Sequence, residues 1–137
     1  MTEKYTGGCR CGALRYEVAA ETMFMNHCQC LDCQQLSGTG HGSYLSFPIG
    51  HAVQMGPAVR RDLRTDSGST KHHSSCAECG SPVSLTFSGM PGLFTVHAAS
   101  LDDPSRFEPQ AITYAERAQP WDRLDAALQR FETSPNA

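Results

Sequence analysis

The sequence has 137 residues, of which 39% are hydrophobic and 18% are charged, with a formal net charge of −3 and an isoelectric point near 6.0. This length suits one domain with its own core, so we expect residues 1–137 to form a single domain. The weakly acidic balance offers no basic surface for a nucleic acid, and no segment reaches the roughly 20 apolar residues of a membrane span.

Short strands dominate the predicted elements. Residues 13–18 alternate apolar and polar side chains, which predicts a half-buried strand, and residues 23–26 are expected to pair with it after a turn. Further strands are predicted, in chain order, at residues 42–47, 69–75, 83–87, 93–97 and 111–114. The frequent glycines and prolines between them favour many turns and a mainly β fold.

Helices are predicted in two places only. The first is a short turn at residues 31–36, closed by Ser37-Gly38. The second is a short C-terminal helix at residues 121–131, which follows Pro120 and whose spacing predicts one apolar face. The residues on that face are Trp121, Leu124, Leu128 and Phe131. We expect this helix to cover one face of the core, with binding to a partner as the alternative.

The seven cysteines are the main functional signal. The N-terminus lacks the apolar core of a secretory signal, which predicts a cytoplasmic protein. Disulfides are rare in that reducing compartment, and an odd count would leave one cysteine unpaired in any case. Metal binding is therefore the leading interpretation.

Four cysteines form two glycine-flanked pairs. Cys9-x-Cys11 and Cys76-x2-Cys79 resemble metal knuckles, in which glycine permits the sharp turn that brings amide groups toward the sulfurs. Four thiolates from two such pairs can complete one tetrahedral zinc site closed to substrate. We expect this site to be structural and to contribute folding free energy.

The other three cysteines, in Cys28-x-Cys30-x2-Cys33, lie within six residues. A strand end followed by one helical turn can direct all three sulfurs to one point, which leaves a fourth metal position open, as in catalytic zinc sites. Two alternatives stay open: an iron-sulfur cluster, and completion of the site by a histidine. The histidines considered are His27, His41, His72, His73 and His97.

In this pattern the chain resembles the glutathione-dependent formaldehyde-activating enzyme (GFA) family, also called the CENP-V-like family. The resemblance rests on three cysteine motifs and their flanks, followed by Leu101-Asp102-Asp103-Pro104 and a late aromatic at Trp121. The motifs are Gly7-Gly8-Cys9-x-Cys11-Gly12, Cys28-x-Cys30-x2-Cys33 with Leu36-Ser37-Gly38, and Cys76-x2-Cys79-Gly80-Ser81-Pro82. Gln29 and Gln34 depart from it, since the family often has a histidine and a basic residue at these positions.

The resemblance implies an Mss4-like fold of antiparallel sheets stapled by zinc, with two zinc ions per chain. It implies that Cys9, Cys11, Cys76 and Cys79 hold the structural ion and that Cys28, Cys30 and Cys33 hold the catalytic one. It also implies a carbon-sulfur lyase whose partners are a small-molecule thiol, such as glutathione, and an aldehyde such as formaldehyde. The departures at Gln29 and Gln34 imply less positive charge near the second metal.

Other residues are weaker candidates. Proton transfer between thiol and developing alkoxide would suit Asp32 or one of the five histidines named above. His72 and His73 lie on a predicted strand, so one should face inward and one outward. Tyr44 and Phe47 would either line a pocket or belong to the core. A non-catalytic zinc-binding module for protein interaction is the rival function, and a nucleic-acid-binding zinc ribbon is disfavoured by the acidity.

Overall fold

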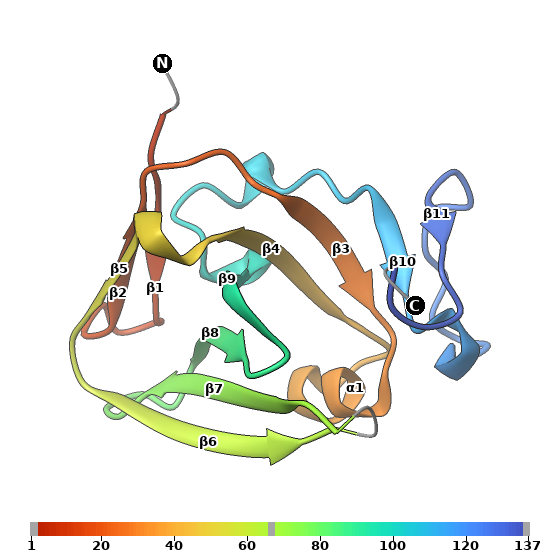
Figure 1. The fold of residues 1–137 in the computed structure, drawn as a ribbon, viewed down its shortest axis with the longest axis horizontal. Helices are drawn as coiled ribbons and strands as arrows, with labels where there is room; N and C mark the ends of the chain where they lie inside the picture. Colours follow the sequence, from red (N-terminus) through yellow and green to blue (C-terminus); the bar gives the residue numbers. More distant parts are fainter. Residues whose placement is uncertain (1–2, 66–67, 136–137) are drawn as a thin grey trace.

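The chain folds into two β-sheets that lean against each other, in a computed structural model that describes residues 3–65 and 68–135 (Figure 1). The smaller sheet has the strand order β1-β2-β5 and the larger one the order β11-β10-β3-β4-β9-β8-β7-β6. The strands of the smaller sheet are β1 (Tyr5–Gly8), β2 (Arg15–Val18) and β5 (Ala52–Met55). Those of the larger sheet are β3 (Phe24–Cys28), β4 (Gly42–Pro48), β6 (Ala58–Arg64), β7 (Thr70–Cys76), β8 (Pro82–Phe87), β9 (Met90–His97), β10 (Ala111–Thr113) and β11 (Gln129–Arg130).

Helical structure is scarce in the described residues. The α-helix is α1 (Leu31–Ser37), and the 3₁₀ turns are η1 (Ile49–His51), η2 (Ala98–Ser100), η3 (Pro104–Arg106) and η4 (Ala115–Arg117). Within this part of the chain, no helix has the length and apolarity that crossing a membrane requires. The mainly β fold predicted from the sequence is therefore confirmed, as is the short helix after Cys30.

The predicted pairing of residues 13–18 with residues 23–26 is wrong. Both segments are strands, but β2 pairs with β1 and β5, whereas β3 pairs with β4 and β10 in the other sheet. Alternation identifies a half-buried strand without identifying its partner. Pairing is antiparallel except at β10, which runs parallel to both β3 and β11.

The predicted C-terminal helix at residues 121–131 is also wrong. This segment is irregular until β11, and Trp121, expected on its apolar face, is 62% exposed. The buried side chain is instead the carboxylate of Asp122, which accepts a hydrogen bond from Gln29 Nε2 (3.0 Å) and contacts His41 Nδ1 (2.9 Å). Tertiary hydrogen bonds thus override the local helical spacing.

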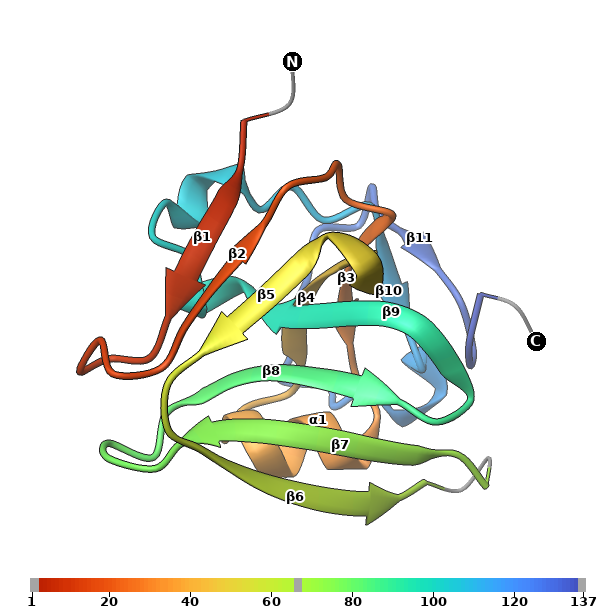
Figure 2. The same ribbon diagram turned by 60° about the vertical axis from the view of Figure 1, so that its left-hand side comes forward.

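The main core is built from residues of both sheets, and Figure 2 shows how these sheets face each other, with β1, β2 and β5 brought forward. Tyr16 and Val18 of β2 are fully buried against this interface, together with Leu45 and Phe47 of β4. Phe47 also stacks edge-on with Tyr5, at 4.9 Å between ring centroids. Phe47 is therefore a core residue.

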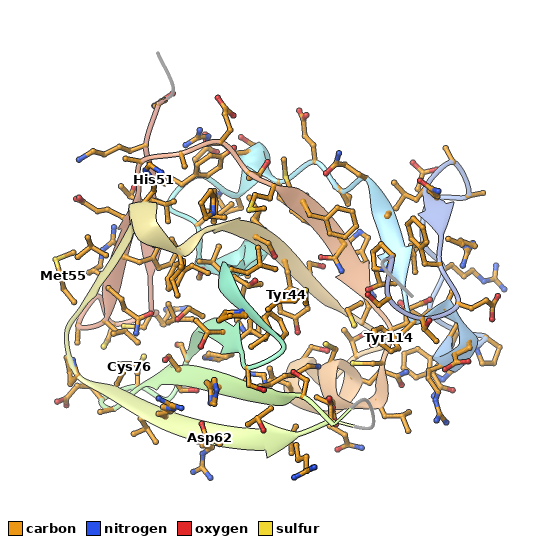
Figure 3. The ribbon with its side chains drawn as sticks, viewed as in Figure 1. Tyr44, His51, Met55, Asp62, Cys76 and Tyr114 are labelled. Carbon is orange, nitrogen blue, oxygen red and sulfur yellow. The ribbon has the colours of Figure 1, made fainter. Side chains whose placement is uncertain are left out.

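The opposite face of the larger sheet is more polar and carries the second group of cysteines. Strand register places the side chains of Lys71, His73, His97, Tyr44 and Cys28 on this one face. A small buried cluster there includes Cys28, Cys33 and Tyr44, with Tyr114 packed against it. In Figure 3 Tyr44 and Tyr114 lie toward α1, whereas Cys76 is at the far left.

Candidate metal centres

The first cysteine cluster brings together Cys9, Cys11, Cys76 and Cys79, whose sulfur atoms all lie within 4.8 Å of one another. Cys11 Sγ is 3.6 Å from Cys9 Sγ and 3.7 Å from Cys76 Sγ. Sulfurs at the corners of a tetrahedron with metal–sulfur bonds of about 2.3 Å would be about 3.8 Å apart. The four thiols therefore have the spacing that one tetrahedral metal ion needs.

Backbone turns explain this arrangement. Gly12 and Gly80 follow the two pairs with φ of +85° and +78°, a left-handed conformation that suits glycine. These turns direct amide groups at the sulfurs: Leu14 N donates to Cys9 Sγ (3.2 Å) and Cys79 N to Cys76 Sγ (3.4 Å). The cluster joins the β1–β2 connection of the smaller sheet to the β7–β8 connection of the larger one.

The second cluster brings together Cys28, Cys30 and Cys33, again with their sulfurs within 4.8 Å of one another. Cys28 ends β3, and Cys30 is the N-cap of α1, where its sulfur accepts a hydrogen bond from Cys33 N (3.4 Å). Gly38 ends the helix in the left-handed conformation with φ of +77°. The structure thus groups the cysteines four and three, as the spacing predicts.

No histidine completes the second cluster in the described part of the chain. The group whose ligand atoms lie within 4.8 Å of one another contains the three cysteines alone. His27 contacts Ser43 Oγ (2.8 Å), His41 contacts Asp122, and His72 contacts Asp62 Oδ1 (2.8 Å). Three thiols that no histidine, carboxylate or fourth cysteine of the described residues joins match a site that keeps one position for an exchangeable ligand.

A lysine that the sequence analysis did not single out lies against this cluster. Lys71 Nζ is 3.6 Å from Cys30 Sγ and 4.0 Å from Cys33 Sγ, and the Lys71 side chain is only 12% exposed. Burial acts to lower the pKa of Lys71, but the three thiol groups and Asp32 raise it above its ordinary value. The ammonium of Lys71 thus faces the sulfurs and the Asp32 carboxylate, the anionic partners that a buried lysine needs. One sequence signal could have pointed to Lys71. It lies on the predicted strand two residues before His73, so both side chains are on the same face of that strand.

Tyr44 is the second donor to the cluster. Its hydroxyl donates to Cys33 Sγ at 3.1 Å. Burial, followed by the charge of Cys33, raises the pKa of Tyr44, so the phenol keeps its proton. Gly42 leaves the space for this contact, because a Cβ at Gly42 would overlap the Tyr44 hydroxyl and lie 2.6 Å from its Cζ.

The two glutamines that depart from the family pattern have structural roles. Gln29, between Cys28 and Cys30, donates from Nε2 to Asp122. Gln34 donates from Nε2 to the carbonyl oxygens of Gln29 (2.8 Å) and Arg117 (2.9 Å). These bonds tie the cysteine-bearing loop to the C-terminal segment, and Lys71 supplies the cationic charge that neither glutamine carries.

The histidines expected to move protons are mostly held neutral. Burial lowers the pKa of His27 to about 4 and that of His97 to about 4, and it also lowers the pKa of His73. His73 and His97 face the same side of the sheet as Lys71, and His73 Nδ1 and His97 Nε2 are buried without a hydrogen-bond partner. Asp32, the other candidate, faces Lys71 Nζ at 3.9 Å.

A cleft of about 650 Å³ opens beside the second cluster. His97, Gly42 and Ser43 line one part of it, and Arg10 and Arg15 line another. The three cysteines are not among its lining residues, but Gly42 is the cross-strand partner of Cys28 and His97 is that of Tyr44. The cleft therefore reaches from Cys9 of the first cluster to strand residues next to the second, and its charged side chains are Arg10 and the ion pair of Arg15 with Asp102.

The fold and the two clusters define a β-rich protein whose thiols are arranged to hold metal ions. Residues 4–117 match the family described as glutathione-dependent formaldehyde-activating enzyme, and the chain belongs to that family. Its fold is similar to the crystal structure of a Rhodobacter sphaeroides protein, with a TM-score of 0.61 and 19% sequence identity. The similarity covers 79% of this chain and 99% of that one.

Proposed function

We propose that this protein is a zinc-dependent enzyme of the carbon-sulfur lyase type, which adds a thiol to formaldehyde or another small aldehyde, or catalyses the reverse reaction. The thiol is glutathione or a molecule like it. Membership of the formaldehyde-activating family supports this reaction class. The observation that carries the proposal is the group of three cysteines, to which no histidine, aspartate, glutamate or further cysteine among the described residues adds a fourth ligand atom.

The donor set fits zinc at both clusters, since thiolate is a preferred zinc ligand and the four-sulfur spacing is tetrahedral. In this proposal residues 1–137 form one cytoplasmic domain with two ions, a structural one held by Cys9, Cys11, Cys76 and Cys79 and a catalytic one held by Cys28, Cys30 and Cys33. Bound at the second cluster, zinc would supply a Lewis acid that lowers the pKa of a substrate thiol.

The residues around the second cluster have distinct tasks. Tyr44 and Lys71 donate to the sulfurs of Cys33 and Cys30, which orients those thiolates. The cleft has Arg10 in its lining, beside Arg15 in its ion pair with Asp102, and Arg10 offers a cation to a substrate whose remainder carries carboxylates. In the addition the thiol loses its proton, its sulfur bonds to the carbonyl carbon, and the carbonyl oxygen takes up a proton; elimination reverses these changes.

The test is the rate of exchange between formaldehyde, glutathione and S-hydroxymethylglutathione, measured by magnetisation transfer in NMR. Because formaldehyde adds to thiols unaided, the catalysed rate must be separated from this background by its dependence on protein concentration. We expect the wild type to accelerate exchange and Cys30→Ser, with an unchanged circular dichroism spectrum, to fall to the background rate. Replacing glutathione with 2-mercaptoethanol then measures what the carboxylates contribute.

A wild-type protein that holds both metal ions and leaves the exchange rate at background would contradict the proposal. The non-catalytic zinc module would then be the better interpretation.

A further inference from the structure

Lys71 is held against the second cluster by the register of the larger sheet. It lies on β7 between Leu63 of β6 and Phe87 of β8. A lysine side chain normally extends into water, but this one is 88% covered and directs its ammonium at Cys30 and Cys33. Burying a cation in this way is costly unless anions face it.

The charge of the cluster explains why a cation belongs there. Three thiolates around a divalent ion carry one net negative charge, and a thiolate in the fourth position makes it two. A neutral ligand leaves the net charge unchanged. A buried cation a few ångströms from the sulfurs therefore stabilises the complex with an anionic fourth ligand more than the complex with a neutral one.

Asp32 faces Lys71 from the first turn of α1 and opposes this effect. Its carboxylate is 3.9 Å from Lys71 Nζ, but its side chain is 37% exposed, so water screens it more than it screens the buried ammonium. Tyr44, the other polar group in contact with the sulfurs, donates a hydrogen bond without carrying a charge. Among the contacts that the structure describes at this cluster, the positive charge thus comes from Lys71.

We propose that Lys71 is a positioning residue that makes the fourth position of the second metal centre selective for an anionic ligand, a thiolate, over a neutral one. This inference rests on the proposed function in that the three cysteines hold a divalent ion. It goes further by assigning ligand selectivity to a residue outside the metal-binding set.

The experiment compares two probes on the cobalt-substituted protein, whose visible absorption changes when the fourth ligand changes. The probes are 2-mercaptoethanol, which binds as a thiolate, and imidazole, which is neutral. We expect Lys71→Met to raise the dissociation constant for the thiol by about tenfold or more and to change that for imidazole by less than about twofold. Lys71→Arg, which keeps the charge, should stay within about threefold of wild type for both probes.

Two matched variants serve as controls. Lys4→Met makes the same substitution at a lysine that is 60% exposed and pairs with Glu17, and it should leave both affinities unchanged. Asp32→Asn removes the opposing charge and should strengthen thiol binding without affecting imidazole, a shift opposite in sign to that of Lys71→Met. If Lys71→Met does not fold, Lys71→Gln, which removes the charge but keeps a polar side chain, tests the inference, and we expect the same selective loss of thiol affinity.

The results separate the two proposals. A wild-type protein whose cobalt spectrum does not respond to thiol would overturn the proposed function. A responsive wild type in which Lys71→Met binds thiol equally well, or loses thiol and imidazole to the same extent, would overturn the role of Lys71 alone.

Discussion

Gly42 shows how a single position without a side chain shapes the second centre. It begins β4, opposite Cys28, and the space where a Cβ would stand is filled by the phenol of Tyr44. Tyr44 in turn packs against His97, at 5.0 Å between ring centroids, and is 5% exposed. The ring has little room to move, so the hydroxyl depends on Gly42 to reach Cys33.

We expect Gly42→Ala to destabilise the protein by about 1–3 kcal/mol, because the new methyl group overpacks a buried ring. Thermal or urea unfolding measures this cost. Tyr44→Phe removes the overlapping oxygen, so the double variant should lose less stability than the sum of the two single variants. Strict additivity would mean that Gly42 and the Tyr44 hydroxyl are not coupled.

The C-terminal segment shows how an element depends on contacts from elsewhere. Asp122 holds this segment against Gln29 and His41, and Gly40 leaves room for it, since a Cβ there would lie 2.6 Å from Asp122 Oδ2. Further along, Phe131 N donates to Ile112 O (2.9 Å) and continues the pairing beside β11. A helical interpretation would bury Trp121 and expose Asp122, the reverse of what the structure shows.

The effects of replacing Asp122 and its neighbour Trp121 on stability should therefore differ clearly. Asp122→Ala should cost about 2–3 kcal/mol of unfolding free energy, because it leaves buried donors on Gln29 and His41 unpaired. It should also weaken metal binding by the three cysteines, whose loop Gln29 anchors. Trp121→Ala should change stability by no more than about 0.5 kcal/mol. Chemical denaturation measures both, and the opposite order would contradict the anchoring role of Asp122.

Sequence patterns indicated local features better than distant ones. Cysteine spacing and neighbouring glycines predicted the two groups of thiols, because knuckles and one helical turn are set by adjacent residues. The strands predicted at residues 42–47, 69–75, 83–87, 93–97 and 111–114 likewise correspond to β4, β7, β8, β9 and β10. Three other features depend on residues far away in the chain, and a local sequence pattern does not predict them. They are the pairing partner of β2, the burial of Asp122 and the contact of Lys71 with Cys30.

At the scale of the whole molecule, the first cluster connects the two sheets. Cys9 and Cys11 lie in the first half of the β1–β2 connection, Cys76 ends β7, and Cys79 lies in the turn between β7 and β8. The second cluster is local by comparison, since its three cysteines fall within one strand end and one helix. A metal at the first cluster therefore constrains the fold far more than one at the second.

Cys76→Ser should accordingly lower folding stability by several kcal/mol or leave the protein insoluble, since metal binding at a structural site contributes directly to folding. Cys30→Ser should keep the fold and reduce the metal content from about two ions per chain to about one. Elemental analysis together with circular dichroism provides the measurement. Similar unfolding in both variants would contradict this division between the clusters.

Strand β7 makes the two centres interdependent. It carries Cys76 at its end and Lys71 five residues earlier, a distance of roughly 17 Å along an extended strand. An ion held by Cys76 therefore anchors the strand whose other end delivers the ammonium to Cys30. Loss of the first ion would release that anchor, so damage to the site at one end of β7 would also disturb the placement of the ammonium at the other.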